Sequence, residues 1–93
     1  MTYELAFHPA ALKEWQGLDA SIRTQFKKKL AERLENPYVP SAQLRGHPHR
    51  YKIKLRTIGY RLVYQVMEDQ VRVLVLAVGK RDRSAVYYKA EKR

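Results

Sequence analysis

The 93-residue chain has no cysteine and no long apolar run. Without cysteine it forms neither disulfide bonds nor thiolate metal sites, and it has no thiol for catalysis. Its longest uninterrupted apolar run, residues 73–78, is far too short to span a bilayer. The first residues alternate in polarity and lack the apolar segment of a signal peptide. We therefore expect a cytoplasmic protein with no membrane partner, folded as a single domain over residues 1–93.

Acidic residues are also missing from the middle of the chain. The whole sequence carries 19 Lys and Arg against 9 Asp and Glu, a formal net charge of +10. Residues 36–67 contain no acidic residue and six basic ones, which are Arg45, Arg50, Lys52, Lys54, Arg56 and Arg61. A stretch that cannot balance its own positive field attracts a polyanion. A basic surface kept for solubility is the weaker interpretation, because interspersed charges would serve solubility equally well.

Apolar periodicity in the first half of the chain predicts a strand followed by a helical hairpin. Alternation over residues 2–7 is typical of a half-buried strand. A helix is expected over 9–17, with Leu12 and Trp15 facing inward and a glycine at its end. The next helix begins after Asp19 or Ser21 and ends before a proline. Its expected buried positions, four residues apart, are Ile22, Phe26, Leu30 and Leu34.

The second half predicts a proline-rich loop over 37–48, three antiparallel strands and a short C-terminal helix. The strands are expected at 50–55, 60–67 and 71–78, joined by turns of hairpin length. The last strand is almost wholly apolar and is therefore expected to be central in the sheet. A basic loop over 79–83 and a helix beginning after Asp82 or Ser84 and running to Lys92 complete an α+β fold, in the order β-α-α-β-β-β-α.

Three cations of the acid-free stretch are expected to share one patch. Lys52 and Lys54 point to the same face of their strand because side chains alternate. If the hairpin folds symmetrically about its turn, Lys54 lies opposite Arg61, and Lys52 lies opposite Val63. Opposed residues have Cβ atoms roughly 5 Å apart, and like charges at that distance destabilise a sheet. The arrangement indicates that an anionic ligand or partner neutralises the patch.

Arg81 and Tyr87 follow the last strand, and the chain has room to fold both back over this patch. Clustered cations bind phosphates, and they lower the pKa of a lysine so that it can accept a proton. RNA supplies its own nucleophile, the 2′-hydroxyl, and catalysis of phosphoryl transfer rests on positioning and charge stabilisation. The missing carboxylates disfavour a two-metal nuclease, and we expect no metal or other cofactor. The residues thus permit a metal-independent ribonuclease without singling it out.

Histidines and the lysine triple have plain structural interpretations. His47 and His49 are residues of acid–base type, but histidines in such loops are more often bystanders. His8 precedes the first helix and is expected to be structural. Residues 27–29 are three consecutive lysines, and a solvated helix face is the simplest explanation of them.

Segments 51–56, 59–66 and 78–84 resemble the RelE toxins of bacterial RelBE toxin–antitoxin systems. Residues 11–15 and 27–30 are similar as well, so the resemblance covers nearly the whole chain. It implies a ribosome-dependent mRNA interferase, which enters the vacant A site and cleaves the codon displayed there. In this reaction the 2′-hydroxyl attacks the adjacent phosphate and leaves a 2′,3′-cyclic phosphate and a free 5′-hydroxyl.

The resemblance implies catalytic roles for Lys52, Lys54, Arg61, Arg81 and Tyr87. Either lysine would activate the 2′-hydroxyl, and Arg61 would stabilise the phosphorane-like state. Arg81 would assist the leaving group or neutralise charge, and Tyr87 would stack on the mRNA. Which group is the general base or acid stays open. The surface cations expected to contact RNA are Arg45, Arg50, Arg56, Lys80, Arg83, Lys27, Lys28 and Lys29.

The resemblance also implies partners. A RelB-like antitoxin would wrap the toxin and mask or distort its basic site, and the complex would repress its own operon. The toxin would contact small-subunit ribosomal RNA and mRNA, and it would reach operator DNA only through the antitoxin. Two alternatives stay open: a DNA gyrase inhibitor of the ParE type, which shares the fold, and a non-catalytic RNA-binding domain.

Overall fold

The computed structural model describes residues 2–80 and 85–93 of the chain. The described elements follow the predicted α+β order, with two short 3-10 helices added in the connections. They are β1 (Glu4–Phe7), α1 (Pro9–Gln16), α2 (Ala20–Glu35), η1 (Pro40–Ala42), β2 (Arg50–Leu55), β3 (Tyr60–Met67), η2 (Glu68–Gln70), β4 (Arg72–Lys80) and α3 (Ala85–Glu91).

The four strands form one mixed sheet in the order β1-β4-β3-β2. β4 is central as predicted, antiparallel to β3 and parallel to β1. The predicted bounds of β2 and β3 are confirmed at both ends. The prediction of a loop from Gly79 onward is wrong for its first two residues. Gly79 and Lys80 pair with Arg61 and Tyr60, and this pairing extends β4.

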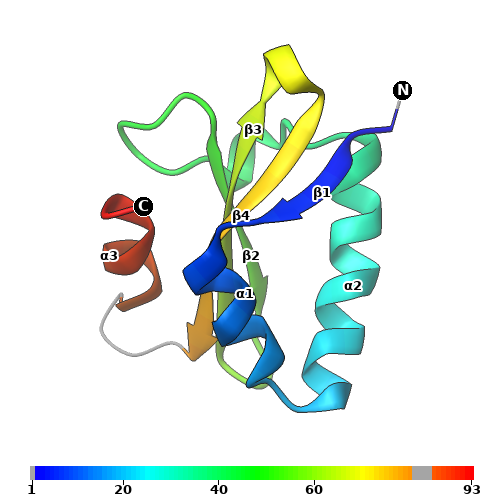
Figure 1. Cartoon of the computed structure of the whole chain (residues 1–93), viewed down its shortest axis with the longest axis vertical. Helices are drawn as coiled ribbons and strands as arrows, with labels where there is room; N and C mark the ends of the chain where they lie inside the picture. Colours follow the sequence, from blue (N-terminus) through cyan, green and yellow to red (C-terminus); the bar gives the residue numbers. More distant parts are fainter. Residues whose placement is uncertain (1, 81–84) are drawn as a thin grey trace.

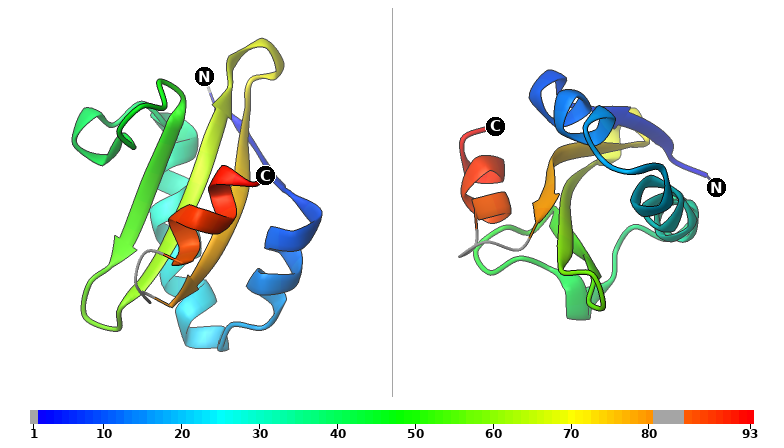
Figure 2. Two further views of the ribbon diagram at one scale, coloured as in Figure 1. Left: turned by 90° about the vertical axis from the view of Figure 1, so that its left-hand side faces the viewer. Right: turned by 90° about the horizontal axis from the view of Figure 1, so that it is seen from below.

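Helices cover both faces of the sheet, as the three views in Figures 1 and 2 show. α1 and α2 cover one face, and the larger apolar core lies between them and the sheet. α3 lies on the opposite face over a smaller cluster that includes Val63, Ala77 and Val86. Because each face has its own cover, side-chain alternation along β2 and β3 decides which residues meet α3.

The inward face of α1 differs from the prediction. Trp15 is buried as expected and contacts the rings of Phe7 and Phe26, with centroids 5.3 and 6.2 Å apart. Leu12, however, is 40% exposed, and Ala11 is fully buried in its place. Ala11 and Trp15 are four residues apart and form the stripe that packs on the sheet, which turns Leu12 toward solvent.

α2 buries the predicted positions Ile22, Phe26 and Leu30, while Leu34 is only partly buried. Asp19 occupies the N-cap position, although its side chain makes no capping hydrogen bond. His8 has the structural role expected of it, because its Nδ1 accepts a hydrogen bond from the Ala10 N–H at the start of α1 (3.1 Å). Within residues 2–80 and 85–93, no helix has the length and apolar character needed to cross a membrane.

Candidate active site

The predicted hairpin register is confirmed. Lys54 lies opposite Arg61, and Lys52 lies opposite Val63. Cross-strand partners share a face of the sheet, so the three cations lie on the face that α3 covers. Arg61 is only 8% exposed, and its Nη1 donates a hydrogen bond to the Tyr60 carbonyl (3.1 Å). The guanidinium is therefore held in place inside a cationic patch.

α3 places Tyr87 on the same face as these cations. Gly79 pairs with Arg61, and a Cβ atom at Gly79 would lie 3.6 Å from the Val86 side chain. α3 therefore crosses the sheet next to Arg61. Tyr87 is half-buried and packs against the apolar cluster that contains Val63. The structure thus brings Tyr87 to the face that carries Lys52, Lys54 and Arg61. Arg81, the fifth predicted residue, lies outside the described residues.

Glu14 on α1 ties the end of the chain to the sheet. Its carboxylate accepts hydrogen bonds from both Nη atoms of Arg93 (2.8 and 3.1 Å) and from the Val78 N–H (3.2 Å). Lys89 of α3 lies 3.2 Å away. Burial alone would raise the pKa of Glu14, but these hydrogen bonds outweigh it and hold the pKa below its usual value of 4.5. The charged form of Glu14 therefore stabilises the docked position of α3.

Replacing Glu14 with glutamine is expected to loosen α3. A folded-state pKa below the unfolded value gives stability that is present near neutral pH and lost as pH falls through the folded pKa. Removing the charge is expected to cost about 1–2 kcal/mol of local stability, which means roughly tenfold faster amide exchange in α3. Hydrogen-exchange measurements at neutral pH test this. Glu4→Gln is the control, because Glu4 is exposed and lies 3.8 Å from Arg72. Unchanged protection of α3 in Glu14→Gln would contradict the assignment.

Arg50 and His47 also hold α3. Arg50 donates from Nη1 to the Ala90 carbonyl (3.1 Å) and from Nε to the Gln65 side chain (3.0 Å). The sequence suggested that His47 is a bystander, but this interpretation is wrong, because His47 pairs with Glu91 of α3. The exposed side chain of His49 agrees with the bystander interpretation. In this structure Arg50, which we expected to contact RNA, is engaged in internal hydrogen bonds.

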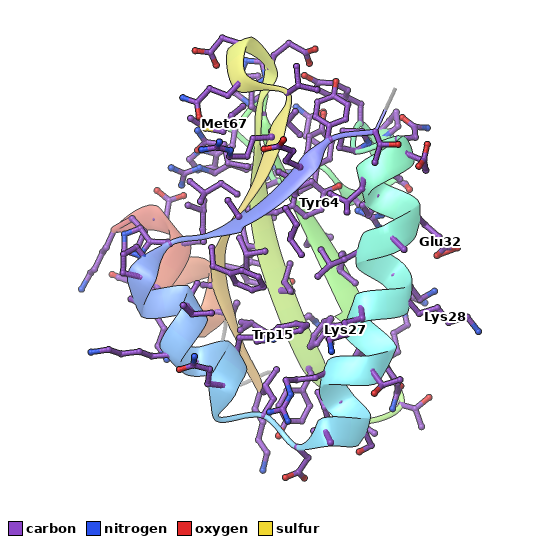
Figure 3. All side chains as sticks on the ribbon, turned by 45° about the vertical axis from the view of Figure 1, so that its right-hand side comes forward. Trp15, Lys27, Lys28, Glu32, Tyr64 and Met67 are labelled. Atoms are coloured by element: carbon purple, nitrogen blue, oxygen red, sulfur yellow. The ribbon has the colours of Figure 1, made fainter. Side chains whose placement is uncertain are left out.

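The other cations expected to contact RNA lie at the surface where they are described. Arg45, Arg56 and Lys80 are exposed, as are all three lysines of the triple. Figure 3 shows Lys28 pointing away from the sheet, together with Glu32. Arg83 lies outside the described residues.

Arg33 of α2 is a site residue that the sequence did not indicate. It lines a pocket together with Lys52, Lys54 and Arg56. Its Nη1 donates to the Lys52 carbonyl (3.2 Å) and to the Tyr64 hydroxyl (3.0 Å). Its position four residues after Lys29 was the available signal, because both belong to one helix face.

Cations and one aromatic ring are the chemically relevant groups of this face. Among residues 2–80 and 85–93, no group of three or more His, Cys, Asp or Glu side chains is placed to hold a metal ion. Lysine and arginine side chains grip phosphate oxygens and stabilise the charge that develops during phosphoryl transfer. The arrangement suits a phosphodiester substrate.

Comparison with known proteins shows the family of this chain. A family model described as "ParE toxin of type II toxin-antitoxin system, parDE" matches residues 5–85. The chain is 56% identical over 93 residues to the mRNA interferase toxin RelE of Escherichia coli (strain K12), covering 100% of this chain and 98% of that protein. The chain belongs to the RelE group of the RelE/ParE toxin superfamily.

Solved RelE structures have the same fold. A variant of E. coli toxin RelE in the free state superposes with a TM-score of 0.92 at 54% identity, covering 100% of this chain and 98% of that one. The toxin of the intact E. coli RelBE toxin–antitoxin complex superposes with a TM-score of 0.83 at 54% identity. That match covers 87% of this chain and 99% of the solved one. The predicted RelE fold is therefore confirmed over the described residues.

Proposed function

We propose that this RelE-group chain is the toxin of a type II toxin–antitoxin system and a ribosome-dependent mRNA endoribonuclease acting in the cytoplasm. The observation that carries the proposal is the face that Lys52, Lys54, Arg61 and Tyr87 share beside α3. Its close relative is named an mRNA interferase toxin. Like charges this close together repel one another and destabilise the sheet. The negative charge of an RNA phosphate would relieve that repulsion.

The chemistry follows from the charges on this face. The 2′-oxygen of the substrate attacks the adjacent phosphorus and gives up its proton, while the bond to the 5′-oxygen of the next nucleotide breaks and that oxygen gains a proton. Lys52 or Lys54 assists the first proton transfer as the amine nearest the substrate phosphate. Arg61 stabilises the extra charge on the phosphate oxygens in the transition state. We retain Arg81 as the cation near the leaving oxygen on the basis of the family pattern.

Tyr87 is proposed to orient the codon by stacking on a base. RNA recognition of unpaired bases commonly uses aromatic rings in this way. Its half-buried position against the small cluster under α3, which includes Val63, supports this role. The exposed cations of the same chain are proposed to contact ribosomal RNA and mRNA.

A RelB-like antitoxin is the proposed protein partner. RelE of E. coli is seen in complex with its antitoxin. A basic site is neutralised by a partner whose segments are acidic or apolar, and such complementarity also speeds association. We propose that this partner covers or distorts the cationic face, and that it supplies the DNA contacts when the complex represses its operon.

Incubation of the toxin with programmed bacterial ribosomes tests the proposed activity. Primer extension on the mRNA is expected to show new 5′ ends within the A-site codon. The name of the matching family makes a ParE-type gyrase inhibitor the second candidate. Intact mRNA together with inhibited gyrase supercoiling would support that candidate and contradict the proposal. Ribosome or RNA binding with neither effect would indicate a non-catalytic RNA-binding domain.

A further inference from the structure

A cationic groove runs along the outer edge of the sheet, between β2 and α2. It consists of two adjoining pockets of about 240 and 340 Å³. Lys54 and Arg56 line both pockets, so the two are continuous. Each volume is many times the roughly 30 Å³ of a water molecule, which leaves room for a phosphate group with its hydration.

Two rows of polar side chains form the walls of this groove. One row comes from α2, where Gln25, Lys29 and Arg33 recur every four residues and so lie on one helix face. These positions are roughly 6 Å apart along the helix axis. Lys52 and Lys54 form the other row and are roughly 6.8 Å apart along β2. Each row therefore presents two cations at a similar interval, and Gln25 continues the helix row by one more turn.

Charge among the described lining residues of the groove is all of one sign. Within residues 2–80 and 85–93 the lining includes five cations, which are Lys29, Arg33, Lys52, Lys54 and Arg56, and no carboxylate. Five like charges along one groove repel one another, so a polyanion that lies there gains both attraction and relief of that repulsion. An extended strand of linked phosphates fits this pattern better than a single small anion.

Arg33 is the preorganised member of the set. Besides its bonds to Lys52 and Tyr64, its guanidinium carbon lies 5.8 Å from the centre of the Tyr64 ring. The Tyr64 hydroxyl in turn donates to the Pro37 carbonyl (2.6 Å). A guanidinium fixed by such contacts loses little side-chain entropy when it binds an anion.

The groove is continuous with the candidate active site. β2 is the edge strand, so the lysines whose Cβ atoms share the face of Arg61 also line the groove on its outer side. A strand held at Lys54 for cleavage passes over this edge into the groove. Ribosomal RNA, mostly helical, would present its phosphates on a convex surface rather than as one thin strand.

We propose that this groove binds the phosphate backbone of the mRNA strand next to the cleaved position. The proposal rests on the proposed function. It adds Arg33 as a substrate-binding residue, assigns Lys29 and Arg56 to the mRNA rather than to ribosomal RNA, and makes the edge of β2 the exit path of the strand. Binding in the groove is expected to be independent of the RNA sequence, because contacts to phosphates carry no sequence information.

Charge reversal with a matched control tests the groove. Lys29→Glu and Arg56→Glu change exposed side chains of the groove, and Lys13→Glu makes the same charge change at an exposed position on α1. The probe is a fluorescent uridine oligonucleotide of about eight nucleotides, measured by anisotropy in a salt series. Each groove variant is expected to weaken binding about tenfold and to reduce the slope of log K against log salt by about 0.7. Lys13→Glu is expected to change both much less.

Ribosomes that carry no message provide the second arm. The groove variants are expected to bind them as the wild type does, because the groove holds mRNA. Weaker binding to these ribosomes with unchanged oligonucleotide binding would assign the groove to ribosomal RNA and overturn the proposal. An equal loss of oligonucleotide affinity in Lys13→Glu and in the groove variants would also overturn the proposal, since net charge alone would then explain the affinity. A wild-type protein that binds the oligonucleotide through the groove but cleaves nothing would refute the proposed function alone.

Discussion

Arg61→Met is expected to reduce A-site cleavage by about 10²–10³-fold while the protein stays folded, because we propose that the guanidinium stabilises charge that develops only in the transition state. The side chain is 8% exposed and lies opposite Lys54. Directly opposed like charges destabilise a sheet by about 0.2–1 kcal/mol. Methionine fills similar space without charge, so the variant is expected to be at least as stable as the wild type.

Opposite changes in activity and stability distinguish a catalytic group from a structural one. Single-turnover cleavage on programmed ribosomes gives the first quantity, and urea unfolding gives the second. Arg72→Met is the matched control, since Arg72 is a half-buried arginine of β4 outside the site. Full cleavage by Arg61→Met would remove Arg61 from the mechanism. A loss of cleavage with an equally large loss of stability would mark Arg61 as structural.

Phe26→Ala is expected to lower the free energy of unfolding by about 3–5 kcal/mol. Phe26 is fully buried where α2 meets α1, in contact with the ring of Trp15. The total stability of a domain of this length is about 5–14 kcal/mol, so the loss is a large share of it. Because α2 also carries the helical wall of the groove, looser packing of α2 is expected to weaken RNA binding as well.

Leu12→Ala provides the comparison for Phe26→Ala. Both positions are apolar and helical, but Leu12 is 40% exposed. Its replacement is expected to change stability by no more than about 0.5 kcal/mol. Urea denaturation of both variants gives the two values. Similar losses at the two positions would contradict the orientation of α1 described above.

The hairpin of β2 and β3 shows what the sequence was sufficient to predict. A short turn between two alternating strands leaves little freedom in register, and a slip by one residue would turn Tyr51 and Ile53 out of the core. The pairing of Lys54 with Arg61 followed from that local constraint. The complete strand order could not be predicted from such local constraints, because β1 pairs with β4, which lies near the other end of the chain.

Long-range ion contacts were equally beyond sequence reasoning. Arg93 and Glu14 are 79 positions apart, and Arg33 is 19 positions from Lys52, whose backbone carbonyl it donates to. Charged residues at such separations meet only after helices and sheet have packed. The inward face of α1 was missed for a related reason: in a helix of eight residues, Ala11 and Leu12 pair equally well with Trp15 at helical spacing.

The central claim is that the cations of β2 and β3 promote attack by the substrate's own 2′-hydroxyl. A single 2′-deoxynucleotide placed on the 5′ side of the cleaved phosphate, in an mRNA on programmed ribosomes, tests this most directly. The mechanism predicts that cleavage at that phosphate is abolished while the toxin still binds the ribosome. Continued cleavage at the same phosphate would show that another nucleophile attacks it and would contradict the mechanism.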